Sequence, residues 1–124
     1  MSEAIANAER VLVAAGIEPH IEVVALALEP DEERALAFSL REAVTNVIRH
    51  AQARHCWIGL TTSSGRAVLE VRDDGCGGNA PEGSGLSGMR ERLRQVAGTV
   101  ERSGDRGTRL LITLPCGRAT GLAS

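Results

Sequence analysis

The segment from Asp73 to Met89 places two adjacent aspartates and several glycines between a strand pattern and a helix pattern. The strand pattern is the alternation of Ala67, Leu69 and Val71, which predicts that Asp73 lies at a strand end. Glycine has no Cβ, so the N–H groups of a glycine-rich turn can approach an anion closely. The helix that follows would direct its N-terminus at the same anion. The segment therefore predicts a phosphate-binding loop between a strand and a helix.

Other interpretations of this segment give different predictions. The Asp-Asp-Gly sequence that starts at Asp73 is also a common turn that needs no ligand. The spacing of Gly83, Gly85 and Gly88 matches a dinucleotide fingerprint, but that fingerprint leaves a strand directly inside a βαβ unit. Here a loop with Pro81 precedes the glycines and no parallel crossover is expected to follow. A mobile lid that closes over phosphates fits these glycines better.

The composition is that of one soluble domain. The 124 residues are 43% hydrophobic but only 2% aromatic, so the core must be built from Ala, Val, Leu and Ile. A net charge of −2 argues against a broad nucleic-acid or anionic-membrane surface. All 14 basic residues are Arg, which excludes any mechanism that needs a Lys and leaves Arg as the bidentate phosphate partner.

Cysteine and histidine positions suggest no disulfide framework and no zinc pattern. The three cysteines are widely spaced and form no Cys-x-x-Cys pair, which predicts reduced thiols. His20 is expected in a surface loop, and His55 and Trp57 are expected to be structural. No apolar run is long enough to span a bilayer.

Hydrophobic periodicity predicts the element order α-β-α-β-β-α-β-β. The predicted helices cover 2–15, 30–51 and 88–97, and the predicted strands cover 21–28, 54–62, 66–73, 99–102 and 108–114. Ser2 is the expected N-cap of the first helix. Because the predicted hairpins are sequential, the order favours a mixed, largely antiparallel sheet with helices on one face.

The long helix carries a polar stripe beside its apolar one. Four residues, Glu42, Asn46, Arg49 and His50, fall within an arc of about 100° on an ideal helix. Glu and Asn supply oxygen ligands for a hard cation such as Mg²⁺, and Arg and His can contact phosphates. The alternative is a solvated face with Glu–Arg pairing. That alternative explains Asn46 least well, because Asn is a mediocre helix former.

Asp73 also predicts a base preference. A carboxylate accepts a hydrogen bond from the exocyclic amine of adenine, whereas guanine presents a carbonyl oxygen there. A buried polar group left unpaired costs about 1–3 kcal/mol, which is enough to discriminate. The hydroxyl of Thr108 could donate on the same side; alternatively, Thr108 is simply a β-branched strand residue.

Taken together, these blocks resemble the ATP-binding domain of sensor histidine kinases. Residues 41–51 resemble the asparagine box, and Asp73-x-Gly75-x-Gly77 resembles the first glycine box. Residues 83–92 resemble the second glycine box, and Gly107-Thr108 resembles the last one. The form Gly-x-Gly-Leu-x-Gly-Met-Arg-Glu-Arg is similar to the subclass paired with NarL-type helix-turn-helix response regulators.

The resemblance implies the GHKL fold, an α/β (α+β) two-layer sandwich, over residues 1–115, with 116–124 as a C-terminal tail. It implies that ATP and Mg²⁺ are the cofactors and that Asn46 binds the Mg²⁺, with Glu42 as an indirect metal support or a base. Arg49 and His50 would contact phosphates, and Asp73 would bind the adenine amine. The remaining expected ATP-site residues are Gly75, Gly77, Gly83, Ser84, Gly85, Leu86, Gly88, Met89 and Thr108.

The family's dimerisation domain, which carries a phosphoacceptor His next to an acid, has no counterpart in this sequence. His20, His50 and His55 lie in no such motif. The chain is therefore expected to be a cytoplasmic catalytic half that does not autophosphorylate alone. Its expected partners are that missing domain and a NarL-type regulator, with no nucleic acid and no direct membrane contact. The alternatives are an anti-sigma-factor serine kinase of the same superfamily and a domain that binds nucleotide without turnover.

Overall fold

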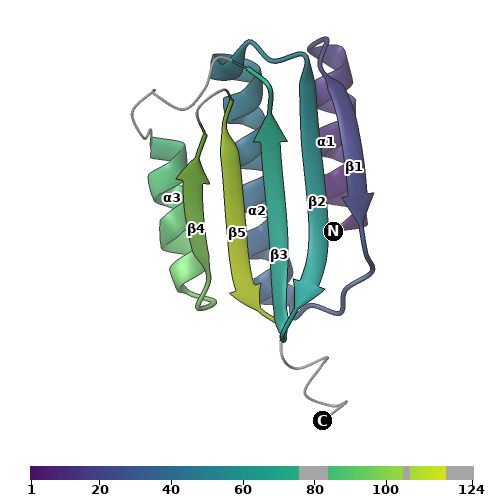
Figure 1. Cartoon of the computed structure of the whole chain (residues 1–124). Coiled ribbons are helices and arrows are strands. Elements are labelled where there is room, and N and C mark those ends of the chain that lie inside the picture. The colour runs from purple at the N-terminus through teal and green to yellow at the C-terminus, as the bar shows by residue number, and fades with distance from the viewer. Residues whose placement is uncertain (76–83, 105–106, 117–124) are drawn as a thin grey trace.

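The computed structural model describes residues 1–75, 84–104 and 107–116, which form two layers (Figure 1). One layer is a five-stranded mixed sheet, and the helices cover one of its faces. In chain order the elements are α1 (Ser2–Ala14), β1 (Glu18–Val23), α2 (Pro30–Asn46), a π-helical segment (Val47–Ala51), β2 (His55–Ser63), β3 (Arg66–Asp73), α3 (Ser84–Arg94), β4 (Thr99–Ser103) and β5 (Arg109–Pro115). The predicted element order and the one-sided sheet are confirmed.

In the strand order β1-β2-β3-β5-β4, the starts of β1, β2 and β5 and the ends of β3 and β4 lie at the same end of the sheet. β1 runs parallel to β2, because α2 crosses over between them, and the other pairs are antiparallel. Glu18 at the start of β1 is opposite His55 at the start of β2. Cys56 of β2 is opposite Asp73, the last residue of β3. Residues from three strands can therefore meet at this end.

The sequence at the start of α2 explains why the helix begins there. Pro30 occupies the first turn, where its missing N–H costs nothing, and acidic residues follow at the positive end of the helix dipole. The backbone N–H of Glu29 donates to the Glu32 carboxylate at 2.9 Å. That bond satisfies one of the N–H groups left free at a helix start.

The end of this helix differs from the ideal helix that the sequence predicts. After Asn46 the backbone continues as a π-helix over Val47–Ala51 and ends at Gln52, which has a left-handed φ of 53°. A π-helix uses i→i+5 hydrogen bonds, so the angular positions calculated for an α-helix do not hold beyond Asn46. Short π segments often occur at functional sites, and this one spans the predicted phosphate contacts.

The core lies between the sheet and the helices and is aliphatic, as the composition predicts. Fully buried side chains come from every helix and from the central strands: Leu12, Leu36, Leu40, Ile58, Leu60, Leu69, Met89, Leu93, Ile112 and Leu114. Phe38 and Trp57 are only half-buried. The core also includes Cys116, one residue beyond the predicted domain boundary, whose N–H donates to the carbonyl of Gly65 at 2.9 Å.

The predicted limits of β1 and α3 and the predicted N-cap of α1 are wrong. β1 begins at Glu18 and ends at Val23, because its pairing with β2 and not its β-propensity sets its limits. α3 begins at Ser84, four residues early, since burial of Leu86 and Met89 outweighs the low helix propensity of the glycines. Met1, not Ser2, is the N-cap of α1. No helix in the described residues has the length and apolar character needed to cross a bilayer.

Candidate functional site

The end of β3 holds a buried carboxylate. Asp73 is 5% exposed, and its Oδ1 accepts a hydrogen bond from the N–H of Gly75 at 2.8 Å. Its own N–H donates to the carbonyl of Thr108 at 2.9 Å. Burial raises the pKa of Asp73, and nearby Asp74 adds to this, while hydrogen bonds from the backbone of Gly75 and Thr108 oppose it. The backbone therefore holds an acidic acceptor in a place where water solvates it poorly.

Such a carboxylate retains hydrogen-bonding capacity. A carboxylate has about four acceptor positions on two oxygens, and the backbone donors of Gly75 and Thr108 do not fill all of them. A ligand that offers N–H donors and no acceptor at this point would be favoured. An exocyclic amine has this character.

The neighbouring acid, Asp74, has a different role. Its Oδ1 accepts two hydrogen bonds of 2.9 Å, from the backbone N–H groups of Arg54 and His55. The His55 bond is the main cause of its lowered pKa, helped by Arg54 and by the charge of His55 and opposed by desolvation. Asp74 is exposed and ties the end of β3 to the start of β2. The sequence alone does not show that Asp73 and Asp74 have different roles. The pairing of β2 with β3 does.

The backbone geometry at position 107 explains why a glycine precedes Thr108. The φ of Gly107 is +145°, and a Cβ at this position would lie 2.1 Å from the carbonyl oxygen of Asp73. Only glycine allows the start of β5 to approach the end of β3 this closely. Gly104 has a φ of +142°, and its Cβ would lie 2.1 Å from the carbonyl oxygen of Gly107. The sequence alone predicts no role for Gly104, although its position in a hairpin turn could have suggested one.

The predicted metal and phosphate residues lie along the end of α2. Glu42 and Asn46 are half-buried and one helical turn apart, so their side chains are neighbours. Arg49 is exposed in the π-helical segment and lines a groove that Glu42 and Asn46 do not line. His50 lies in the same π-helical segment.

The second glycine box coincides with the start of α3. Ser84 and Gly85 form its first turn, and Leu86 and Met89 are 3% and 0% exposed. These two side chains pack α3 into the core. A Cβ on Gly88 would be 3.8 Å from the ring of Phe38, an ordinary contact distance. Gly77 and Gly83 lie outside the described residues.

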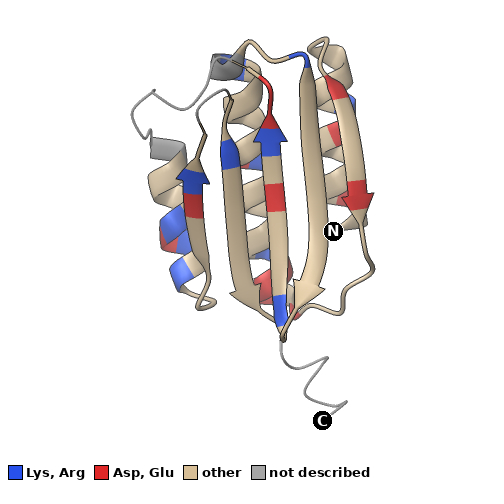
Figure 2. Cartoon of the chain, in the orientation of Figure 1, with Lys and Arg blue, Asp and Glu red and all other residues tan. Residues whose placement is uncertain are grey.

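A groove of about 850 Å³ crosses the helical layer between α1, α2 and α3. Apolar residues line it, including Val11, Phe38 and Ile48, together with arginines at Arg10, Arg34, Arg41, Arg49 and Arg92. The guanidinium of Arg92 lies 4.2 Å from the centre of the Phe38 ring. Basic residues recur along α3, whereas acidic residues mark the end of β3 (Figure 2). The molecule thus separates a basic, partly apolar helical face from the acidic strand end.

Comparison with known proteins agrees with this geometry. Residues 31–118 match the family described as "Histidine kinase-, DNA gyrase B-, and HSP90-like ATPase". The chain belongs to this family. The match covers nearly all of α2, the π-helical segment, the strands β2 to β5 and α3. These are the elements that hold the predicted site. Membership confirms the resemblance inferred from the boxes, and an ATPase domain implies ATP binding.

Individual relatives of this ATPase family narrow the comparison. The chain is 37% identical over 92 residues to the sensor histidine kinase YvfT of Bacillus subtilis, covering 71% of this chain and 24% of the relative. It is 32% identical over 112 residues to the signal transduction histidine-protein kinase/phosphatase UhpB of Salmonella typhimurium, covering 86% of this chain and 22% of the relative. The chain thus spans about a quarter or less of the length of these two kinases.

Solved structures confirm the fold. The histidine kinase domain of the Erythrobacter litoralis EL346 blue-light activated histidine kinase superposes with a TM-score of 0.83 at 16% identity, covering 99% of this chain and 68% of that one. At this identity the likeness establishes the fold alone. It confirms the predicted two-layer sandwich with a mixed sheet.

Proposed function

We propose that this chain is the Mg-ATP-binding catalytic domain of a sensor histidine kinase, which transfers the γ-phosphoryl group to a His on a separate dimerisation domain. The observation that carries the proposal is the environment of Asp73. Its carboxylate is at the end of β3, the residue is 5% exposed, and a backbone hydrogen bond fixes the carboxylate in place. Its place beside Gly107 suits an adenine edge that donates an N–H. Guanine would bring a carbonyl oxygen against the same carboxylate and lose affinity.

The residues of α2 fit a magnesium ion. Asn46 and Glu42 are half-buried oxygen donors on adjacent turns, the ligand type that Mg²⁺ takes in proteins. In the proposal Asn46 binds the ion directly and Glu42 supports it or acts as a base, while Arg49 and His50 contact phosphates. When bound, Mg²⁺ would neutralise charge on the phosphate oxygens. The protein's own contribution is to orient the triphosphate and to exclude water.

The glycine boxes complete the proposed ATP site. Gly75 and Gly77 lie next to Asp73 in the chain. Gly83 comes directly before α3 and Ser84, Gly85 and Gly88 lie within it, and these residues would form a short lid over the phosphates. Backbone N–H groups at the start of α3 can face the phosphates, as expected for a helix N-terminus. Leu86 and Met89, both buried, support the proposed lid by fixing α3 on the core.

We assign the groove between α1, α2 and α3 to a helix of the dimerisation domain. Charge complementarity supports this assignment, since five arginines and one glutamate line the groove and the phosphoacceptor His of such domains stands beside an acid. Ile48 is 38% exposed and Val11 is 40% exposed, and both line the groove, which offers apolar contact to a partner. The groove includes Arg49, so it would bring the acceptor close to the proposed phosphate contacts.

A reconstituted phosphotransfer assay tests this function. The chain is mixed with Mg-ATP and the separately purified dimerisation domain of a relative such as UhpB. Histidine phosphorylation, recognised by its acid lability, is expected on the added domain and not on this chain alone. The matched control is the same domain with its acceptor His replaced by Gln. Acid-stable phosphoserine on a partner would instead favour the serine-kinase alternative and overturn the proposal.

A pair of variants tests the groove. Ile48→Glu should lower phosphotransfer while leaving ATP affinity unchanged, because Ile48 lines the groove and lies outside the proposed ATP site. Val13→Glu is the matched control, since Val13 is 60% exposed on α1 and does not line the groove. Equal phosphotransfer by both variants would contradict the assignment. In the cell, the proposed complex would act on the cytoplasmic side of a sensor and pass the phosphoryl group to a NarL-type regulator.

A further inference from the structure

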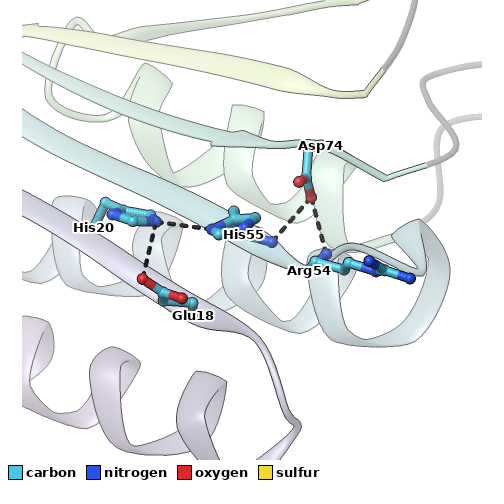
Figure 3. A network of polar contacts seen from close by, with 5 residues as sticks. All are labelled: Glu18, His20, Arg54, His55 and Asp74. Carbon is cyan, nitrogen blue, oxygen red and sulfur yellow. Dashed lines mark hydrogen bonds and ion pairs between the residues drawn. The ribbon is translucent and has the colours of Figure 1, made fainter.

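The open face of the sheet, opposite the helices, carries a cluster of metal-ligand residues that the proposed kinase chemistry does not use. Glu18 and His20 are two residues apart on β1, so both side chains lie on the same face. His55 starts β2 directly opposite Glu18. The close view in Figure 3 shows the three side chains converging between the two strands. The sequence does not predict this cluster, because strand pairing across 35 residues creates it.

The distances within the cluster suit one shared cation. The Nε2 of His20 is 2.9 Å from the Nδ1 of His55 and 3.7 Å from the Oε2 of Glu18. One ligand atom from each of the three residues lies within 4.8 Å of the other two. Ligand bonds of about 2.0–2.2 Å around a tetrahedral Zn²⁺ place the ligand atoms roughly 3.3–3.6 Å apart. Side-chain shifts of well under an ångström to about one ångström would therefore bring all three atoms onto one ion.

Neighbouring residues hold the two imidazoles in place. Both rings stack on Trp57, with centroid separations of 5.2 Å for His20 and 5.7 Å for His55. The guanidinium of Arg72 lies 4.3 Å from the centre of the Trp57 ring. The backbone N–H of His55 donates to Asp74. Ligand residues braced in this way lose little further freedom on binding.

The cluster is also open to solvent. The side chains of His20 and Glu18 are 37% and 66% exposed, so a cation can enter without opening the fold. Two imidazoles and one carboxylate favour Zn²⁺ and similar transition ions over Mg²⁺, which prefers oxygen ligands. Three protein ligands leave room for water on a four-coordinate ion. These properties separate the cluster from the proposed Mg-ATP site.

We propose that Glu18, His20 and His55 form a binding site for one Zn²⁺-class cation on the open face of the sheet. The ligands are a carboxylate oxygen of Glu18, the Nε2 of His20 and the Nδ1 of His55. The ion would cross-link β1, an edge strand, to β2. It would thereby fasten α1 and β1 to the rest of the sheet, independently of ATP.

Calorimetric titration of the metal-free chain with ZnCl₂, without nucleotide, tests the site. Saturable binding of one Zn²⁺ per chain is expected, and His20→Gln or His55→Gln should weaken it at least tenfold. Glu18→Gln should weaken it less. Glu22→Gln is the matched control, because Glu22 is exposed on the same face of β1, and its partner in β2 is Gly59. It should bind Zn²⁺ like the unaltered chain.

Two further measurements keep the result decisive. Thermal unfolding of each variant without metal shows whether it folds, and Cu²⁺ bound to the unaltered chain should give nitrogen hyperfine splitting from imidazole in its EPR spectrum. No saturable Zn²⁺ binding, or binding that survives loss of both imidazoles, would overturn the site. Since ATP is absent throughout, failure here leaves the proposed kinase function untouched.

Discussion

Two very different candidate sites lie at the same end of the sheet, one on the face that the helices cover and one on the open face. On one side Asp73 is 5% exposed and backbone groups fix it, while on the open face the side chain of Glu18 is 66% exposed beside two stacked imidazoles. Asp74 links them, since it follows Asp73 in the chain and accepts the N–H of His55. The buried site suits one ligand edge of fixed hydrogen-bonding character, and the exposed one suits a cation that brings its own geometry.

The largest predicted effect concerns the buried site. Gly107→Ala should lower Tm by roughly 5–15 °C, because the new Cβ would meet the Asp73 carbonyl at 2.1 Å and φ is +145°. ATP binding should fall with it. Gly59→Ala on β2 is the matched control, since its Cβ would have only an ordinary 3.9 Å contact. Calorimetric melting of both variants checks this, and equal Tm values would contradict the close approach.

Asp73→Asn should weaken ATP binding without lowering the stability of the fold. ATP affinity should drop about tenfold or more, in line with the loss of about 1–3 kcal/mol for a mismatched buried polar group. Stability at neutral pH should stay equal or rise. Because folding raises the pKa of Asp73, its ionisation costs the folded state stability as pH rises through and above the ordinary value of 3.8. Nucleotide titration and urea unfolding at pH 7 test the two halves. A variant that binds ATP normally would refute the adenine role.

Asp74→Asn should have the opposite sign on stability and a smaller effect on binding. Folding lowers the pKa of Asp74, so its contribution is present above about 3.8 and is lost as pH falls through the lowered pKa. The variant should unfold at lower urea at pH 7, and the difference from the unaltered chain should shrink towards pH 3. It should keep its preference for ATP over GTP. A variant with no loss of stability at pH 7 would show that the bonds to Arg54 and His55 contribute nothing.

The smallest predicted effect is that Cys56 does not react with iodoacetamide in the folded chain. Cys56 is opposite Asp73, fully buried, and burial together with the charges of Asp73 and Asp74 raises its pKa to about 12. Its thiolate is therefore scarce at pH 8. Iodoacetamide should leave Cys56 unlabelled in the native chain and label it after unfolding in urea, as read by peptide mass spectrometry. Rapid native labelling would mean that this end of the sheet opens readily.

The proposed ATP site, which stays a prediction, could be proposed from the sequence because its parts are local motifs. Asp73 ends its strand, and the alternation of Ala67, Leu69 and Val71 indicates which face is buried. The element order could be predicted for the same reason. Three features could not be predicted because they depend on tertiary contacts: the limits of β1, the early start of α3 and the different roles of Asp73 and Asp74.

The open face shows the limit most clearly. His20 was expected in a surface loop and His55 as a structural residue, but parallel pairing places His20 on β1, half-buried against His55. No spacing rule connects two single histidines that lie on separate strands. The π-helical turn after Asn46 is a similar case, since periodicity alone indicates a continuous helix.

In the proposed ATP site, a buried carboxylate at the end of β3 selects adenine, and binding depends on magnesium. The most direct test is calorimetric binding of Mg-ATP and Mg-GTP to the unaltered chain and to Asp73→Asn. We expect a clear preference for ATP that depends on Mg²⁺ and disappears in the variant. No ATP binding, or equal binding of both nucleotides by the unaltered chain, would contradict it.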